Sequence, residues 1–319
     1  MSDATTPTAS DGPTTTDTAP AAPTTPVAAG TAIAGTAIVE GAATAKRKPM
    51  PAWMQSKKIQ PIISLILLIA VWWAATSANL INSLYLPSPQ AVWHAFIEAN
   101  SCRPASAGSS RIVCGEQQYF LWQHLVVSLE RIGIGMLLGI IVGVLVGFLL
   151  AEIGWLNRII LPYINFIRAL PPLGYIGLLI VWFGIGDTTK IWLLFLAAFP
   201  PIVLATVDGI NGVNRDRVNS ALSLGASRPK AFLFVVFPSA LPSIMNGIRL
   251  AVGFAWTTVV AAELNNGIPG IGALAYLSGT ELNTPLTIAC IFVIGIAALL
   301  LDWLILGITH LVTPWVGKE

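Results

Sequence analysis

Two charged residues stand within or at the ends of long apolar stretches, where a charge is costly and commonly serves a function. Arg131, beside Glu130, could attract an anionic group that enters a pore; alternatively, it snorkels to the surface or pairs with a neighbouring helix. Glu263 closes another apolar stretch and could line a substrate entrance or simply face water. For each residue, the sequence leaves both alternatives open.

Catalytic and metal-binding patterns are missing from the sequence. Its three cysteines and three histidines are scattered, without the spacing of a zinc site. A G-x-x-x-x-G-K-[ST] phosphate-binding loop does not occur. We therefore expect no catalytic residue, no metal and no cofactor in this chain, and no ATP hydrolysis by the chain alone.

Cys102 and Cys114 lie between the first two apolar stretches. An oxidising exterior would permit a disulfide between them. Their spacing does not fix their geometry, so the sequence leaves open whether the two residues are bonded.

Composition indicates a membrane protein. Hydrophobic residues make up 55% of the 319-residue chain and charged residues only 10%, whereas ordinary globular domains carry about 25% charged residues. The net charge of +2 is too small to suggest nucleic acid as a partner. The sequence predicts an all-α integral membrane protein in a lipid bilayer.

Six apolar stretches are candidates for helices that cross the bilayer. They cover about residues 59–80, 123–150, 170–184, 191–210, 241–264 and 285–312, within a predicted transmembrane domain at 59–316. Residues 1–50, rich in Thr, Pro and Ala, lack periodicity and are predicted to form a disordered tail. The basic cluster Lys46-Arg47-Lys48 lies near the end of this tail instead of directly preceding the apolar h-region of a signal peptide, which argues against a signal peptide.

Lysine and arginine set the expected orientation. If the N-terminus is inside, most of these residues fall in inner segments, including 46–48, 57–58 and 215–230. The tail and the segment at about 214–228 are therefore predicted to be cytoplasmic.

Glycine and proline patterns predict features of the helices. Gly135, Gly139, Gly143 and Gly147 recur every four residues and line one helix face. Such a face lets another backbone approach closely; a pore narrowed by glycine is the alternative. Paired prolines in Arg168-Ala169-Leu170-Pro171-Pro172 must break or kink the chain at the start of the third stretch, as a hinge or a helix boundary.

The segment at 214–228 has mixed polarity and lies between two long apolar stretches. Val218, Ala221, Leu222 and Gly225 fall at i, i+3, i+4 and i+7, so one face of a helix would be small and apolar. Such a helix is too short to span a bilayer. It is either an ordinary interfacial helix or a knob for a partner's groove.

This segment also resembles the cytoplasmic coupling loop of ABC importer permeases, which reads Glu-Ala-Ala, then a glycine, then Ile-x-Leu-Pro. Asn219-Ser220-Ala221, Gly225 and the residues up to Pro238 stand at the corresponding positions, with Asn219 in place of the glutamate. The resemblance implies contact with an ATPase subunit. The residues that it assigns to ATPase coupling are Asn219, Ser220, Ala221, Leu222, Gly225, Ala226, Ser227 and Pro238.

From about residue 60 to 316 the chain resembles the permease family for taurine, aliphatic sulfonates, nitrate and bicarbonate, and most of all its taurine members. The resemblance is carried by residues 85–89, 121–125, 128–132, 181–186, 223–227, 260–264 and 313–315. It implies a methionine-importer-type permease fold with about six transmembrane helices in a bacterial plasma membrane.

Partners and mechanism are expectations from this resemblance. Two ATPase subunits would carry ATP and Mg, and an external solute-binding protein would deliver a small sulfonate, foremost taurine, for alternating access. We expect the binding protein to select the solute, so that the pore needs no deep site. Each chain has one coupling helix whereas an ATPase pair has two docking grooves, which predicts a second permease chain, most simply in a homodimer.

Three alternatives remain open. The same machinery could carry alkanesulfonates, nitrate or bicarbonate. An ATP-independent secondary transporter would be expected to show intramembrane carboxylates or inverted repeats. A membrane anchor without transport is the third alternative.

Overall fold

The computed structural model describes residues 59–78, 80–104, 110 and 112–316. The chain divides into two units, Met1–Ile62 and Ile63–Glu319. The tail predicted at 1–50 and the basic cluster at 46–48 lie outside the described residues. The second unit contains nearly everything that the structure describes.

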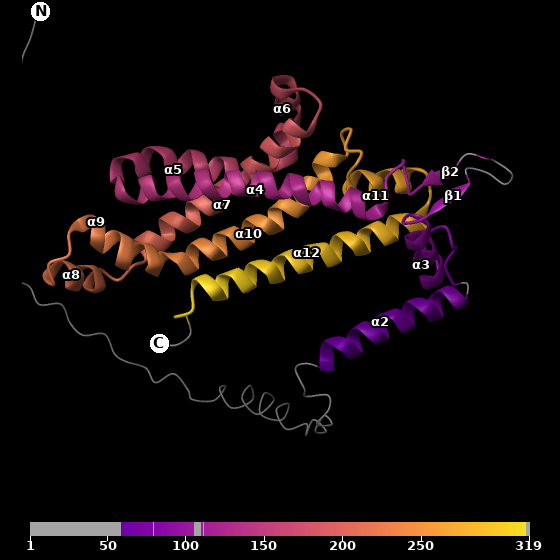
Figure 1. Ribbon diagram of the computed structural model, residues 1–319, viewed down its shortest axis with the longest axis horizontal. Helices are drawn as coiled ribbons and strands as arrows, with labels where there is room; N and C mark the ends of the chain where they lie inside the picture. The colour runs from indigo at the N-terminus through magenta and orange to yellow at the C-terminus, as the bar shows by residue number, and fades with distance from the viewer. Residues whose placement is uncertain (1–58, 79, 105–109, 111, 317–319) are drawn as a thin grey trace, which may run out of the picture. The chain divides into compact units, whose positions relative to one another are not determined.

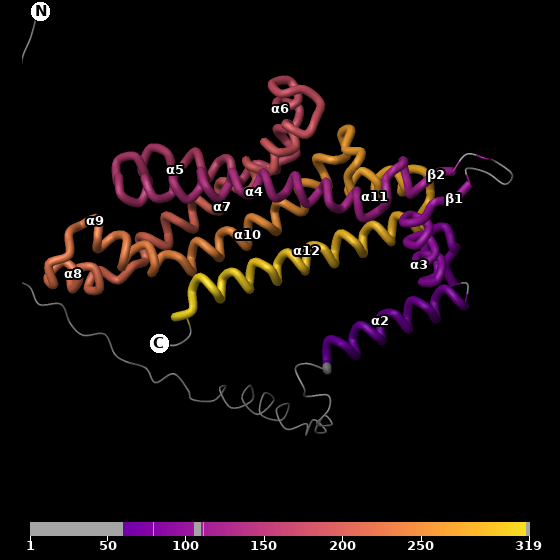
Figure 2. The backbone as a smooth tube through the Cα atoms, in the orientation of Figure 1, coloured from indigo at the N-terminus to yellow at the C-terminus, as the bar shows by residue number. Residues whose placement is uncertain are grey.

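Helices make up most of the described chain (Figure 1), and the tube in Figure 2 follows them in order. The elements are α2 (Ile59–Ser77), α3 (Pro89–Glu98), β1 (Cys102–Pro104), β2 (Ile112–Cys114), α4 (Leu121–Glu152), α5 (Gly154–Ala169), η2 (Pro172–Tyr175), α6 (Ile176–Phe183), α7 (Asp187–Asn211), α8 (Arg215–Ser223), α9 (Arg228–Ala231), η3 (Phe232–Val236), α10 (Phe237–Glu263), α11 (Ile271–Thr280) and α12 (Thr284–Val312).

Helices α4 and α7 pack face to face along the glycine stripe. A Cβ added to Gly135, Gly139, Gly143 or Gly147 would come within 3 Å of a side-chain carbon on α7. Larger residues on α4 would therefore push the two helices apart. The α7 residues that fill these positions are Leu194, Ala198, Ile202 and Thr206. Because both sets of numbers rise together, α4 and α7 run in the same direction.

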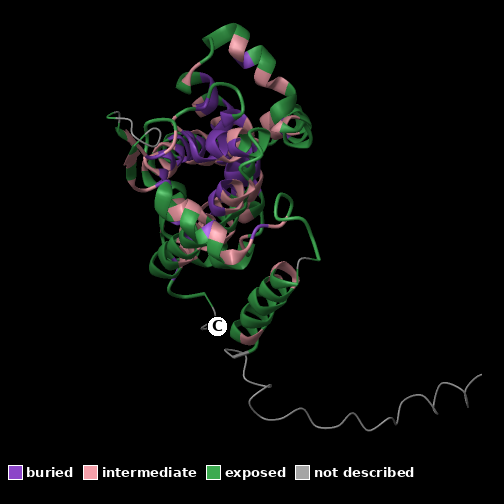
Figure 3. Cartoon of the chain, turned by 90° about the vertical axis from the view of Figure 1, so that its right-hand side faces the viewer, coloured by how far each residue is buried: buried purple, intermediate pink, exposed green. Residues whose placement is uncertain are grey.

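Helix α10 packs against α7 in the opposite direction. A Cβ on Gly247 would lie 2.3 Å from that of Ala205, and one on Gly209 would lie 2.8 Å from that of Ser243. The main hydrophobic core combines side chains of α4, α7, α10 and α12. Figure 3 shows the buried residues concentrated inside this bundle, whereas the outer helices are largely exposed. An exposed apolar surface of this kind suits a lipid environment.

The third predicted span, at 170–184, is wrong as a single helix. Helix α6 has only 8 residues, and the 16-residue helix α5 lies mostly outside the predicted spans. The two pieces are bent by 99° at a short break, because Pro171 and Pro172 lack the N–H groups that would continue α5. Since α4 and α7 run in the same direction, the chain must return between them, and α5 and α6 make that return.

By length and apolarity, the described chain has 5 helices able to cross a membrane, or up to 6 if the bent pair counts as one span. The predicted all-α membrane fold with about six spans is therefore confirmed. The single helical run Arg228–Glu263 joins α9, η3 and α10 into one 36-residue candidate span.

The connection between α2 and α4 carries α3 and a small antiparallel hairpin of β1 and β2. Cys102 pairs with Cys114 in the hairpin register, and the two residues form a disulfide. Arg103 forms ion pairs with Glu98 at 2.8 Å and Glu116 at 2.7 Å. These contacts tie the hairpin to the end of α3.

Candidate functional site

Helix α8 is a short polar helix with no buried residue. Its first turn is capped by Asn214, whose side chain accepts a hydrogen bond from the amide of Asp216 at 2.8 Å. Just after the helix, Leu224 is 89% exposed. A partner that packed against this segment would remove the Leu224 side chain from water. We call residues 214–231, from this cap to the end of α9, the coupling segment.

The i, i+7 spacing predicts that Gly225 extends the apolar face of α8. In the structure, Gly225 instead lies just beyond the end of this helix. Its φ is +88°, in the left-handed region that favours glycine. The Gly225 amide donates to the carbonyl of Leu222, and the Ala226 amide donates to that of Ala221. This pair of bonds is the Schellman arrangement, which closes a helix with a left-handed residue.

Pro238 lies at the start of α10, directly after a π-turn, within the continuous run from α9. In that turn the amide of Phe237 donates to the carbonyl of Phe232. A proline has no amide to donate within a helix, and the wider turn accommodates it without ending the helix. The coupling segment is thus joined to α10 by unbroken helix.

Charged residues meet where α7 begins and α10 ends. We call Arg131, Asp187, Lys190 and Glu263 the charged cluster. Nη1 of Arg131 donates to Oε1 of Glu263 at 2.6 Å, and Nη2 lies 2.8 Å from Oδ1 of Asp187. Nζ of Lys190 lies 3.2 Å from the same oxygen of Asp187. Two cations thus balance two anions, and the cluster connects α4, α7 and α10.

Glu263 is completely buried, so the prediction that it faces water at the membrane surface is wrong. Its Oε1 also accepts from the hydroxyl of Ser128 at 2.7 Å, and its Oε2 accepts from the amide of Gly272 at 2.8 Å. These donors compensate the loss of water. Arg131 is only 4% exposed. Of the alternatives for Arg131, the structure shows ion pairs with residues of neighbouring helices.

Two further side chains of α4 hold the chain between α10 and α11. Nδ1 of His124 accepts from the amide of Gly270 at 3.1 Å, and the hydroxyl of Ser128 accepts from the amide of Ile271 at 3.0 Å. Neither contact was predicted from the sequence, nor was the pairing of Asp187 with Arg131, because these partners lie far apart in the chain. Only the pair of Asp187 and Lys190 has a local spacing, at i and i+3.

Arg249 and Asp302 form a second ion pair, between α10 and α12. Nε of Arg249 donates to Oδ1 of Asp302 at 2.7 Å, and Nη2 donates to Oδ2 at 2.9 Å. This two-pronged geometry is the favourable one for arginine and a carboxylate. Both side chains are partly exposed.

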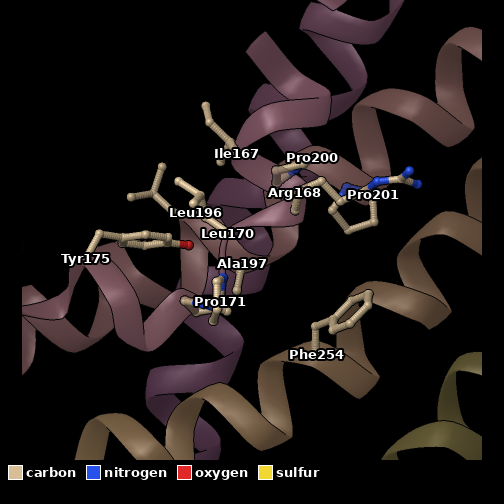
Figure 4. A pocket seen from close by; sticks show the side chains of 12 residues that line it. Ile167, Arg168, Leu170, Pro171, Tyr175, Leu196, Ala197, Pro200, Pro201 and Phe254 are labelled. Atoms are coloured by element: carbon tan, nitrogen blue, oxygen red, sulfur yellow. The ribbon is translucent and has the colours of Figure 1, made fainter. Parts of the chain in front are cut away.

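A cavity of about 210 Å³ opens beside the break between α5 and α6, and we call it the break cavity (Figure 4). Figure 4 shows the Tyr175 hydroxyl pointing toward Leu170 and Leu196, and the Arg168 guanidinium on the other side, beside Pro201. The remaining lining comes from the end of α5, the residues of the break and the middle of α7. These lining residues are Ile167, Ala169, Leu170, Pro171, Pro172, Leu196, Ala197, Pro200 and Pro201.

Within the described residues, no group of three or more histidine, cysteine or carboxylate residues could hold a metal ion. The features with functional potential are therefore surfaces, buried ion pairs and a cavity. Surfaces can bind partner proteins and a cavity can bind a solute. Ion pairs between helices can differ between two conformations.

Comparison with known proteins identifies membrane-transport relatives. Residues 135–318 match the family described as binding-protein-dependent transport system inner membrane component. The chain is 36% identical over 270 residues to the taurine transport system permease protein TauC of Escherichia coli K12, which covers 83% of this chain and 93% of TauC. It is 35% identical to the putative aliphatic sulfonates transport permease protein SsuC of the same organism, over 80% of this chain and 90% of SsuC.

A nitrate import permease, NrtB of Synechococcus elongatus, is 30% identical over 82% of this chain and 94% of its own length. Among solved structures, the MetNI methionine ABC transporter in an inward-facing conformation aligns with a TM-score of 0.53 and 21% identity, covering 62% of this chain and 99% of that chain. This likeness confirms the methionine-importer-type fold. The family match spans more than half of the chain, and the three relatives match over most of their length. The chain is thus a multi-pass membrane permease of the binding-protein-dependent ABC transport family, in the group that includes the taurine, sulfonate and nitrate permeases.

Proposed function

We propose that this permease carries taurine across the bacterial plasma membrane as the membrane subunit of an ATP-driven importer. The observation that carries the proposal is the 36% identity to TauC over 93% of the length of TauC. SsuC, named for sulfonates, is similar to nearly the same degree. A small sulfonate is the solute class that these two relatives share.

We assign ATPase docking to the coupling segment. Its support is the resemblance at Asn219–Ser227, the absence of buried residues in α8 and the exposure of Leu224. A partner with a complementary groove would bury this leucine and gain hydrophobic contact. The ATPase subunits would hold ATP and Mg, and hydrolysis would take place there.

The unbroken run Arg228–Glu263 supplies a mechanical connection for alternating access. One end of this run belongs to the coupling segment, and the other end carries Glu263 of the charged cluster. A displacement of the coupling segment by the ATPases would therefore be transmitted along α10 to the far side of the bundle. Such a motion switches access only if the two states make different contacts.

A homodimer is the simplest assembly for this mechanism. The described chain presents one coupling segment, whereas two ATPase subunits offer two docking grooves. Twofold symmetry would place one coupling segment on each ATPase. An external binding protein would then deliver the solute to the side of the membrane opposite the ATPases.

The test is ATPase activity of the reconstituted transporter, formed from this chain, its co-purifying ATPase and the binding protein. We expect stimulation by taurine above that by alkanesulfonates, nitrate and bicarbonate. Stimulation by one of the other solutes would replace taurine by that solute and retain the mechanism. Uptake by this chain without any ATPase would overturn the importer mechanism in favour of a secondary transporter.

A further inference from the structure

The break cavity lies beside the middle of α7, a candidate membrane span, and we infer that it is near the middle of the bilayer. Its α7 lining, from Leu196 to Pro201, stands about 14 Å from Asp187 and about 15 Å from Asn211 at 1.5 Å per residue. The backbone between α5 and α6 is irregular at this depth. Irregular backbone inside a membrane is tolerated only where protein buries it or where it lines a water-filled cavity.

Arg168 is the cation of this cavity. Arg131 and Arg249 each bind a carboxylate, whereas Arg168 makes no ion pair or hydrogen bond among the residues that the structure describes. Its side chain is exposed. A cation at this depth must find water, an anion or a partner, because exposure to lipid is costly. The guanidinium is therefore available to an anionic solute, and it can bind the oxygens of such a group in a forked geometry.

Two backbone carbonyl groups of α7 carry partial negative charge, opposite in sign to the charge of Arg168. In a regular helix the carbonyls of Leu196 and Ala197 accept from the amides four residues later. Those positions are Pro200 and Pro201, which have no amide hydrogen. All four residues line the break cavity. Leu196 and Ala197, whose carbonyls lack their ordinary helical donor, are thus part of the cavity lining.

We propose that the break cavity is a solute subsite for a small zwitterion whose anionic group binds Arg168 and whose ammonium group binds the carbonyls of Leu196 and Ala197. An aminosulfonate such as taurine has both groups. The cavity of about 210 Å³ has the volume of roughly seven liquid waters, which is ample for so small a solute. This inference rests on the proposed function, and it replaces the expectation that the membrane path has no site of its own.

The first test is equilibrium binding of radiolabelled taurine to the permease and ATPase complex in nanodiscs, without binding protein. We expect Arg168→Gln to weaken binding about tenfold, because a hydrogen-bonded charge partner is lost. Arg168→Lys keeps the charge and should weaken binding less. Arg158→Gln, near the start of α5 and outside the cavity lining, is the matched control and should bind taurine normally.

The second test examines the ammonium end by competition with 2-hydroxyethanesulfonate, which has a hydroxyl in place of the ammonium group. Pro200→Ala and Pro201→Ala restore amide donors to the helix and should reduce the preference for taurine several-fold. A merely structural defect would weaken both ligands equally. Pro162→Ala removes a helical proline outside the cavity lining and should leave the preference unchanged.

Three results would overturn the subsite: no taurine binding by the unaltered complex, normal binding by Arg168→Gln, or an equal loss in Arg158→Gln. These results differ from a failure of the proposed function. If Arg168-dependent binding persists but the complete transporter imports no taurine, the importer assignment fails and the subsite stands. If import proceeds while Arg168→Gln has no effect, the subsite fails alone.

Discussion

Charged residues are buried at one end of the helical run Arg228–Glu263 and exposed beside the other end. At one end, Glu263 is completely buried and bound by Arg131 of α4. Beside the other end, the short helix α8 buries no residue, and Leu224 just after it is 89% exposed. Buried, fully paired charges fix the positions of helices, whereas exposed ones leave a surface that another protein can cover. We therefore expect the Glu263 end to be rigid and the end beside α8 to contact another protein.

The largest expected effect is at the charged cluster. Arg131→Leu leaves Glu263 buried without its cation, which should cost about 3–5 kcal/mol of stability. The measurement is the thermal unfolding of the detergent-solubilised permease. Arg103→Leu, which breaks exposed ion pairs of the hairpin, is the control and should cost less than about 1 kcal/mol.

A second variant distinguishes a lost charge partner from lost packing. Arg131→Met combined with Glu263→Leu removes both charges and should recover part of the stability that Arg131→Leu loses. If Arg131→Leu were as stable as Arg103→Leu, the charged cluster would not fix the helices.

A smaller effect is expected at the contact of α4 and α7. Gly139→Leu places a side chain where the Cβ alone would lie 2.9 Å from that of Ala198. Overpacking of this kind should cost about 1–3 kcal/mol. Gly133→Leu on the same helix has no atom within 4 Å of its Cβ and should unfold at the temperature of the unaltered chain. Equal melting temperatures for the two variants would mean that α4 and α7 do not approach as closely as described.

The smallest change in stability is expected for substitutions of Gly225. Their main effect should be weaker binding of the ATPase subunit. Gly225→Ala forces a left-handed conformation that costs about 1–2 kcal/mol for a residue with a Cβ. Gly225→Asn should be milder, because asparagine adopts this conformation more readily. We expect the membrane bundle to remain folded while the ATPase subunit dissociates more readily during purification, in the order Ala above Asn. Identical retention by both variants would contradict a role for this helix end in docking.

The sequence predicts the long spans well because their apolar length is a local property. The short helix α8 also follows from the sequence, because its polarity differs from that of its neighbours; its role in docking stays a prediction. The prediction fails at α5, a helix left outside the predicted spans, where the polar residues Asn157 and Arg158 interrupt the apolar pattern. It also places Gly225 on a helix face, because spacing does not reveal where a helix stops.

The charged cluster could be predicted only in part. Arg131 and Glu263 are conspicuous because each stands in or at the end of an apolar stretch. Asp187 and Lys190 stand at the start of a span, where charges are ordinary, so their inclusion depends on how α7 packs against α4. Arg168 was noted for its neighbouring prolines, but its place in a cavity depends on the bend between α5 and α6.

The docking role of the coupling segment is tested most directly by the accessibility of position 224. In the described chain, Cys102 and Cys114 are bonded and Cys290 is buried, so Leu224→Cys introduces an exposed thiol. We predict that a membrane-impermeant maleimide labels this variant in inside-out vesicles and not in right-side-out ones, and that bound ATPase subunit protects it. Labelling from the outer side, or equal labelling with and without the ATPase, would contradict the assignment of the coupling segment to ATPase docking.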